Sequence, residues 1–290
     1  MPSPTTWRIR GRELSLARPL VMGIVNVTPD SFSDGGNYFS AGAALAHAAK
    51  LVAEGADILD VGGQSTRPQG AEPVATDEEL RRVLPVIRTL AAERPDVAIS
   101  VDTVKASIAE AAIAAGAHIV NDVSGLRLDA EMAALCAASA VGVVVMHSRG
   151  GIADMATSAH AEYGANFLDE MLEELTARVR AAERAGVGRE AIAVDPGIGF
   201  AKRAEQSLRA LACLERLAAW GYPVVVGASR KRFIGHITGQ SNAAHRASGS
   251  VGAAVMAFDR GAHVLRVHDV AATRHALDVA AAIRDAGSDA

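Results

Sequence analysis

The sequence contains few cysteines and few lysines. Its two cysteines, Cys136 and Cys213, are far apart and form no C-x-x-C pair, so neither a disulfide framework nor a cysteine metal site is expected. Both lie in segments rich in Ala and Leu, where a thiol normally packs as a small apolar side chain. Only four of the 29 Lys and Arg residues are lysines, so a lysine beside a strand end is conspicuous.

The sequence also lacks an excess of positive charge. Its 29 Lys and Arg residues stand against 33 Asp and Glu, giving a formal net charge of -4 and a pI of about 6.1. Binding to nucleic acid or to an anionic membrane normally requires a broad basic surface. We therefore expect neither partner, and any anion must be bound by a few local cations.

Long apolar runs are missing as well. An uncharged stretch near the middle, residues 132–146, contains Ser139 and Gly142 and is shorter than the roughly 18 to 20 residues of a membrane span. Near the N-terminus, residues 7–12 alternate arginine with apolar residues or glycine, which is not the pattern of a signal peptide. These features predict a cytoplasmic protein.

Half of the residues are hydrophobic, and they recur as short apolar runs between segments of helical period. The predicted strands are residues 20–25, 57–61, 98–101, 118–120, 141–146, 191–194, 224–226 and 264–267. The predicted helices are residues 41–54, 77–93, 106–115, 129–138, 163–185, 206–220, 248–260 and 270–286. This alternation from end to end predicts eight parallel β/α units.

Eight such units with apolar strands fit an α/β fold of the (β/α)8 TIM-barrel type. An open doubly wound sheet is the alternative, but a long Pro/Asp/Ser/Gly loop follows the first strand where a G-x-G-x-x-G turn would be needed. Residues 7–9 and 14–16 flank Gly11 and predict a short N-terminal β-hairpin that caps the barrel. Because no linker divides the chain, we expect a single domain over residues 1–290.

Polar residues follow the predicted strands, at the end of a barrel where active sites are built. A single Asp or Ser there is commonly only the N-cap of the next helix. However, Asp102, Asn121 and Asp195 end three strands whose side chains should converge. Their oxygens would accept hydrogen bonds from the N–H groups of a small heterocycle, and Lys231 would contact its carbonyl or a ring nitrogen.

The last strand brings a second group of polar residues. Arg266 and His268 alternate out of it, and together with Asn26 they would bind a diphosphate, since loops after the seventh and eighth strands are frequent phosphate sites. A structural Arg266 paired with Asp269 or Asp30 is the alternative. Mg²⁺ fits the oxygen-rich loop that begins at Asn26, because Mg²⁺ takes few protein ligands.

Two long loops, residues 28–38 and 62–74, are candidate lids that exclude water, or else simple surface connections. Together with the strand ends they carry seven motifs. These are MGIVNVTPDSFSDGG at 22–36, GGQSTRP at 62–68, SVDT at 100–103, NDVSG at 121–125, DPGIGF at 195–200, SRK at 229–231 and RVHDV at 266–270. In this order the motifs resemble the dihydropteroate synthase family of folate biosynthesis.

The resemblance implies condensation of 7,8-dihydropterin-6-ylmethyl diphosphate with 4-aminobenzoate. It assigns the pterin to Asp102, Asn121, Asp195 and Lys231, the diphosphate to Asn26, Arg266 and His268, the Mg²⁺ to Asn26, and the aminobenzoate to Thr66, Arg67, Pro68, Phe32 and Phe200. We expect Asp102, Lys231 and Asp34 to take part in catalysis. The family likeness also implies a homodimer and competition by sulfonamides.

A dissociative substitution fits this chemistry, because diphosphate is a good leaving group and the reduced pterin stabilises a cation.

Positions that depart from the family pattern are Gln64, Ala201, Arg232 and Ser148. Two alternatives stay open: a pterin-binding barrel methyltransferase with a corrinoid partner, and a catalytically silent pterin-binding paralogue.

Overall fold

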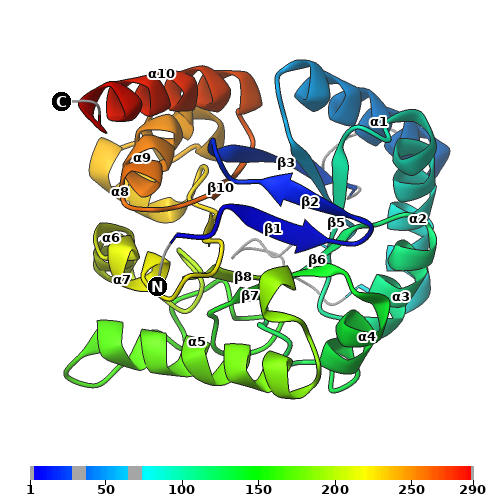
Figure 1. The fold of residues 1–290 in the computed structure, drawn as a ribbon, viewed down its shortest axis with the longest axis horizontal. Coiled ribbons are helices and arrows are strands. Elements are labelled where there is room, and N and C mark those ends of the chain that lie inside the picture. Colours follow the sequence, from blue (N-terminus) through cyan, green and yellow to red (C-terminus); the bar gives the residue numbers. More distant parts are fainter. Residues whose placement is uncertain (1–2, 28–36, 65–73, 289–290) are drawn as a thin grey trace.

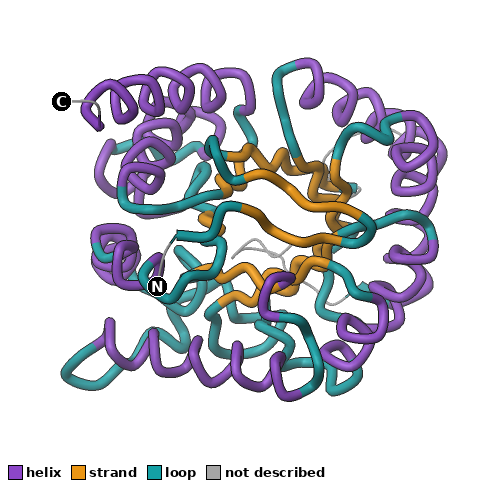
Figure 2. Tube along the Cα trace, viewed as in Figure 1, coloured by secondary structure: helices purple, strands orange, loops and turns teal. Residues whose placement is uncertain are grey.

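Eight parallel strands form a closed barrel in the computed structural model, which describes residues 3–27, 37–64 and 74–288. Around the barrel the strands follow the order β8-β7-β6-β5-β4-β3-β10-β9, and a bridge between Val194 and Val224 closes it. The strands are β3 (Leu20–Asn26), β4 (Ile58–Gly62), β5 (Ala98–Asp102), β6 (Ile119–Asp122), β7 (Gly142–Met146), β8 (Ile192–Asp195), β9 (Val225–Val226) and β10 (Val264–Val267). The predicted TIM barrel is confirmed (Figure 2).

Helices surround the strands on the outside of the barrel (Figure 1). They are α1 (Asn37–Ala53), α2 (Thr76–Glu93), α3 (Ala106–Ala114), α4 (Met132–Ser139), α5 (Phe167–Arg184), α6 (Ala204–Ala212), α7 (Leu214–Ala218), α8 (Arg232–Thr238), α9 (Ala247–Asp259) and α10 (Val270–Ser288). Short 3-10 turns cover Arg189–Ala191 and Ala243–Arg246. Among the described helices, none combines the length and the apolar character needed to cross a membrane.

Two helix predictions were wrong in the number of helices. Three further helices begin three or four residues from their predicted starts, α1 at Asn37, α4 at Met132 and α5 at Phe167. The segment 206–220, predicted as one helix, bends at Cys213 and forms α6 and α7, which lets Leu214 and Leu217 reach the core. After β9 the chain forms α8 before α9, where the sequence pattern predicted α9 alone. The strand boundaries differ from the predicted ones by one or two residues, except for β10, which agrees.

The N-terminal hairpin closes one end of the barrel, as predicted. Strands β1 (Thr6–Ile9) and β2 (Arg12–Ser15) pair in antiparallel fashion and lie across that end (Figure 1). Trp7 and Ile9 are fully buried there, and the indole Nε1 of Trp7 donates a 2.8 Å hydrogen bond to the carbonyl of Ala191. This end of the barrel is therefore sealed, and the opposite end carries the loops that follow the strands.

Inside the barrel, the layer nearest to the hairpin is apolar. Each of the eight strands contributes one residue to it: Met22, Ile58, Ala98, Ile119, Val144, Ala193, Val225 and Val264. A larger apolar cluster lies between the outer face of the strands and the helices. Because side chains alternate across a strand, the residues two positions further along each strand also face the barrel interior.

Candidate active site

The second interior layer is mostly polar. It consists of Ile24, Asp60, Ser100, Asn121, Met146, Asp195, Gly227 and Arg266, each two residues beyond a member of the apolar layer. Three of these eight are ionisable, and a buried charge is costly unless it is paired. The polar layer, called the floor below, thus lies at the end of the barrel where the loops emerge. The apolar layer beneath it, called the plug, fills the barrel toward the hairpin.

Arg266 connects two carboxylates on this floor. Its Nε donates to Oδ2 of Asp60 at 2.6 Å, and an Nη donates to Oδ2 of Asp102 at 2.7 Å. The same Asp60 oxygen accepts a hydrogen bond from the side-chain amide of Asn121 at 3.0 Å. Asp60 is fully buried, so the guanidinium provides the charge that this carboxylate needs. Asn121 is held with its amide nitrogen toward Asp60, which leaves its oxygen as an acceptor.

Asp195 and Lys231 occupy the neighbouring part of the floor. Asp195 ends β8, and its Oδ1 accepts a 2.7 Å hydrogen bond from the backbone N–H of Gly197. Lys231 precedes α8, and its Nζ lies 4.0 Å from the centroid of the Phe200 ring. A cation over an aromatic face is stabilised by the ring quadrupole. Phe200 thereby supports the lysine above the barrel.

Burial shifts the protonation of these groups toward their neutral forms. It raises the pKa of Asp102 to about 7, although Arg266 opposes the shift. It raises the pKa of Asp195 to about 6, with the Gly197 N–H and Lys231 opposing. It lowers the pKa of Lys231 to about 7, with Asp195 opposing. Such perturbed groups gathered at one end of a barrel are typical of a functional site.

An apolar wall stands beside this polar floor. It is a separate cluster formed by Val104, Val123, Met146, Met155, Ala156, Phe200 and the partly buried Ile152. A flat heterocycle could contact this wall with its face while its edge reaches the polar groups of the floor. Asp102 and four residues of this wall, Val104, Val123, Ile152 and Met155, line one small pocket, which is called the slot below.

Asn26 and His268 lie at the ends of adjacent strands. Asn26 closes β3, and His268 follows β10, which pairs with β3 in parallel register. The Nδ1 of His268 lies 3.0 Å from Oγ of Ser229, whose oxygen also accepts the His268 backbone N–H at 3.2 Å. The Ser229 contacts hold the imidazole of His268 at the end of β10, beside the end of β3.

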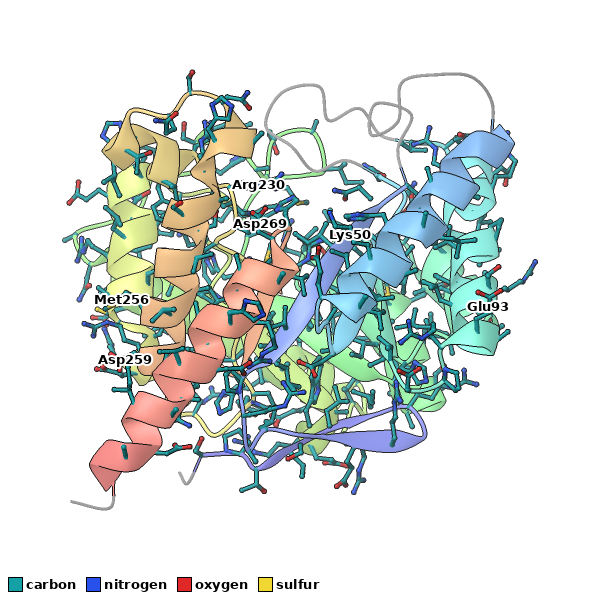
Figure 3. All side chains as sticks on the ribbon, turned by 90° about the horizontal axis from the view of Figure 1, so that it is seen from above. Lys50, Glu93, Arg230, Met256, Asp259 and Asp269 are labelled. Carbon is teal, nitrogen blue, oxygen red and sulfur yellow. The ribbon has the colours of Figure 1, made fainter. Side chains whose placement is uncertain are left out.

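Arg230 and Asp269 form a salt bridge next to these residues, with 2.5 Å between Nη and Oδ1. Both lie toward the end of the barrel opposite the hairpin (Figure 3). The pairing of Arg266 with Asp269 that was considered as an alternative is not found, because Asp269 pairs with Arg230 and Arg266 pairs with Asp60 and Asp102. Asp30, the other partner considered, lies outside the described residues.

Comparison with known proteins identifies the family. The model of the family described as pterin binding enzyme matches residues 22–268. The Bacillus subtilis dihydropteroate synthase is 45% identical over 253 residues, which are 87% of this chain and 84% of that protein. The chain belongs to the dihydropteroate synthase family.

Two solved structures agree with this assignment. The Xanthomonas albilineans dihydropteroate synthase with 4-aminobenzoic acid has a TM-score of 0.90 at 46% identity, covering 97% of this chain and 99% of that one. The synthase of the same organism in complex with 7,8-dihydropteroate has a TM-score of 0.85 at 44% identity, covering 96% and 99% of the two chains. The dihydropteroate synthase family is therefore shown by both sequence and fold.

Several residues that the family likeness assigns to the site fall outside the described residues. These are Asp34, Thr66, Arg67, Phe32 and Pro68, together with most of the two candidate lid loops. The described residues Asn26, Asp102, Asn121, Asp195, Phe200, Lys231, Arg266 and His268 all come from one end of the barrel. The structure thus brings together side chains that are up to 242 residues apart, from Asn26 to His268.

Other polar residues near the strand ends have structural roles. The Asp122 carboxylate accepts the backbone N–H groups of Ser124 and Leu126, at 2.7 and 3.2 Å, and so stabilises the turn after β6. The Thr103 hydroxyl donates to the buried Glu79 of α2 at 2.9 Å, which directs it away from the interior. The ordinary structural explanation for a polar residue at a strand end therefore holds for Asp122 and Thr103.

Sequence reasoning missed two residues of the site, Asp60 and Lys202. Asp60 sits inside the run Ile58-Leu59-Asp60-Val61, and a carboxylate inside a buried strand was a usable signal, because such a group must be paired. Lys202 follows Phe200 closely and is one of only four lysines. Its side chain is 2% exposed, which no local pattern indicates.

The departures from the family pattern have different structural consequences. Arg232 donates from an Nη to the carbonyl of Ala156 at 3.1 Å and so ties α8 to the wall of the slot. Ala201 adopts a left-handed backbone with φ of 46°, a conformation that costs an L-residue roughly 1–2 kcal/mol. Ser148 is fully buried. Gln64 is partly buried at the end of the described loop after β4.

Proposed function

We propose that the open end of this barrel condenses 7,8-dihydropterin-6-ylmethyl diphosphate with 4-aminobenzoate to give 7,8-dihydropteroate and diphosphate. The observation that carries the proposal is the joint presence of Asp102, Asn121, Asp195 and Lys231 above the apolar plug of a barrel of this family. These four offer oxygen acceptors beside an N–H donor, which complement a pterin edge.

The pterin ring would lie in the slot between the polar floor and the apolar wall. Asp195 and Asn121 would accept its amino and amide N–H groups, and Lys231 would donate to its carbonyl or a ring nitrogen. The Arg266 contact, 2.7 Å from Asp102, would keep Asp102 oriented toward the ring. Hydrogen bonds between a buried ring and ionised groups are worth roughly 1.5–3 kcal/mol each.

The diphosphate would be bound at the ends of β3 and β10, where Asn26, Arg266 and His268 supply donors. Mg²⁺ fits this place, because the Asn26 amide offers an oxygen ligand and Mg²⁺ keeps several waters and substrate phosphates as its other ligands. Within the described residues, no group of three or more His, Cys, Asp or Glu side chains could form a protein-only metal cage. When bound, the ion would neutralise charge that develops on the departing diphosphate.

The reaction breaks the C–O bond between the pterin methylene and the diphosphate and forms a C–N bond to the aryl amine, which then releases one proton. We propose a dissociative order, in which departure of the diphosphate comes first. Arg266 and His268 would stabilise the leaving group, and the ring contacts would hold the methylene carbon beside the amine. Phe200, Thr66 and Arg67 would frame the aminobenzoate, and Asp34 would assist from the first loop.

Diphosphate release tests this proposal directly. Purified protein with both substrates and Mg²⁺ should release diphosphate only when 4-aminobenzoate is present, and removal of Mg²⁺ by a chelator should suppress the release. A methyltransferase would instead transfer a methyl group from a methylated reduced folate, and a silent paralogue would bind the pterin without turnover. Either result would overturn the proposed reaction while leaving pterin binding intact.

We also propose that the protein forms a homodimer. Large exposed apolar side chains cluster on one side of the molecule: Leu208 on α6, Ile237 on α8, Met256 on α9, and Val279 and Ile283 on α10. These helices contact one another, and Met256 lies on the outer face of α9 (Figure 3). Exposed apolar patches of this kind commonly mark protein interfaces.

Light scattering after size-exclusion chromatography tests the dimer. The wild-type chain should elute with twice its mass of 29.9 kDa, and the double variant Ile237→Glu, Met256→Glu should elute as the monomer. Leu128→Glu is the matched control, because Leu128 is an exposed apolar residue in the loop before α4. A monomeric wild type, or a dimer that survives the double variant, would contradict this interface.

A further inference from the structure

A lysine lies buried directly behind the site, almost entirely out of contact with solvent. Lys202 is 2% exposed, and its Nζ lies 2.8 Å from Nδ1 of His147 and 3.1 Å from the carbonyl oxygen of Phe200. A lysine is almost never fully buried without partners. The burial of Lys202 beside these two acceptors therefore points to a specific role. Both the charged and the neutral amine have enough N–H groups to donate to both.

A further hydrogen bond links His147 to Glu174 on α5. Because Nδ1 of His147 accepts from Lys202, Nε2 carries the ring proton and donates to Oε2 of Glu174 at 3.1 Å. Burial and the neighbouring Lys202 lower the pKa of His147 to about 3, so the imidazole is neutral. Burial would raise the pKa of Glu174, but hydrogen bonds from His147 and Arg149 lower it to about 2. Glu174 thus anchors the chain from α5.

Lys202 bonds to a turn whose backbone is strained. The turn is the segment 197–201 after β8, and Gly197, Gly199 and Ala201 in it have φ angles of 66°, 76° and 46°. Glycine adopts such angles freely, whereas Ala201 does not. Two further hydrogen bonds hold Ala201. The Ala201 N–H donates to the carbonyl oxygen of Met155 at 2.7 Å, and the Tyr163 hydroxyl donates to the carbonyl oxygen of Ala201 at 3.0 Å.

The same turn carries Phe200 and limits the position of Lys231. The Phe200 ring supports the Lys231 ammonium at 4.0 Å. A Cβ at position 199 would come within 3.1 Å of Lys231 Cδ, so the turn backbone packs directly along that lysine. A displacement of the turn therefore displaces both side chains together.

We infer that Lys202 is a positioning residue for the reaction, which holds the 197–201 turn and through it orients Phe200 and Lys231. The expected effect on kcat rests on the proposed function. The expected effect on pterin affinity can be measured without turnover. Lys202 would act through its hydrogen bond to the Phe200 carbonyl, from a buried position. A misplacement of about 1 Å in a binding group can reduce a reaction rate about a hundredfold.

The variant Lys202→Met tests the inference, because methionine preserves the length of the side chain and removes the N–H donors. We expect kcat to fall about tenfold to a hundredfold and pterin affinity by calorimetry to fall about tenfold. Lys105→Met is the matched control: Lys105 also pairs with a buried partner, Glu79, at 2.8 Å, but does not contact the 197–201 turn. It should lose stability while kcat and pterin affinity stay near wild type.

A rescue variant separates positioning from general stability. Ala201→Gly removes the strain of the left-handed residue, so the turn should form without help from Lys202. The double variant Lys202→Met, Ala201→Gly should therefore regain part of the lost kcat and pterin affinity. Tyr163→Phe, which removes only the hydroxyl that holds Ala201, should give a smaller loss of the same kind, and it provides the test if Lys202→Met does not fold.

Wild-type kcat and pterin affinity in Lys202→Met would overturn the inference. So would losses that Lys105→Met reproduces at equal stability, or an absence of rescue by Ala201→Gly. If Lys202→Met does not fold, wild-type values in Tyr163→Phe would overturn it. Failure of the proposed function looks different, because the wild-type chain itself would then bind pterin without releasing diphosphate.

Discussion

Asp60 and Arg266 form an ion pair inside the barrel, with 2.6 Å between Oδ2 and Nε, although they are 206 residues apart in the sequence. Asp60 is fully buried, and its other carboxylate oxygen, Oδ1, accepts no hydrogen bond from the described residues. Through Arg266 the pair extends to Asp102, and through Asn121 to β6. Two of the groups proposed to bind the pterin, Asp102 and Asn121, are therefore held by the buried carboxylate of Asp60.

Replacement of Asp60 should cost both stability and affinity. Asp60→Asn leaves Arg266 without one of its two carboxylates, and breaking a buried ion pair costs about 3–5 kcal/mol. Urea unfolding measures this loss, and calorimetry should show weaker pterin binding, because Asn121 and Asp102 lose their support. Asp96→Asn is the control, since Asp96 pairs with Arg94 at the surface, where solvent screening leaves such a pair little effect on stability. Equal losses in the two variants would contradict the role of Asp60.

Lys231 and Asp195 should each be required for pterin affinity. Lys231→Ala and Asp195→Ala remove groups that would hydrogen-bond a buried ring, so affinity should fall about tenfold or more. Isothermal calorimetry with the free hydroxymethyl pterin measures the loss. Lys50→Ala is the control, because Lys50 lies exposed on α1 and pairs with Glu54 in the next turn (Figure 3). Wild-type affinity in either site variant would contradict the assignment.

Arg266 and His268 should differ in their effects on the two forms of the pterin. His268→Ala should weaken binding of the diphosphate-bearing substrate and leave the free hydroxymethyl pterin almost unaffected. Arg266→Ala should weaken both, because it also releases Asp102, with the larger loss for the diphosphate-bearing substrate. Competition binding with the two ligands distinguishes these cases. Equal losses for both ligands in Arg266→Ala would show that the arginine is only structural.

The stability of the ligand-free protein should carry a contribution from Asp102 that falls as pH rises. Burial raises the pKa of Asp102 from 3.8 to about 7, so between these values the unfolded chain has lost the proton that the folded chain keeps. Over that range the free energy of unfolding decreases with pH. From about pH 5 to about pH 8, the free energy of unfolding measured in urea should therefore change in a more negative direction in wild type than in Asp102→Asn.

Comparison with the variant isolates Asp102 from other buried groups. The pKa values of His118, His147 and His263 are lowered to about 4, 3 and 4, in each case first by burial. A lowered histidine pKa makes stability increase with pH up to the ordinary value near 6.5, the opposite direction. These histidines are the same in both proteins and cancel in the difference. An identical pH dependence in wild type and Asp102→Asn would contradict the raised pKa.

Much of the fold was predictable because its signals are local. Apolar runs such as residues 264–267 alternate with helical segments, and each pattern reports its own element without knowledge of the rest. The N-terminal hairpin followed from two short apolar runs around Gly11. The bend at Cys213 was not predictable in this way, because residues 206–220 have one continuous helical pattern and packing of Leu214 and Leu217 decides where it breaks.

The candidate site was predictable where a residue ends a strand, because the barrel places every strand end on one face. Asp102, Asn121, Asp195, Lys231, Arg266 and His268 could be named on that basis. The ordered motifs added Thr66, Arg67 and Phe200. The partners of these residues could not be named. The sequence offered Asp269 for Arg266, whereas the structure pairs Asp269 with Arg230 and Arg266 with Asp60 and Asp102.

By itself, the sequence determined the barrel, its capping hairpin and the family, since periodicity and short motifs are properties of contiguous residues. Only the tertiary structure decided which charges neutralise one another and which lysine is buried. Those choices depend on distances between residues that are far apart in the chain, such as Lys202 and His147, and on the high cost of leaving a buried polar group without a partner.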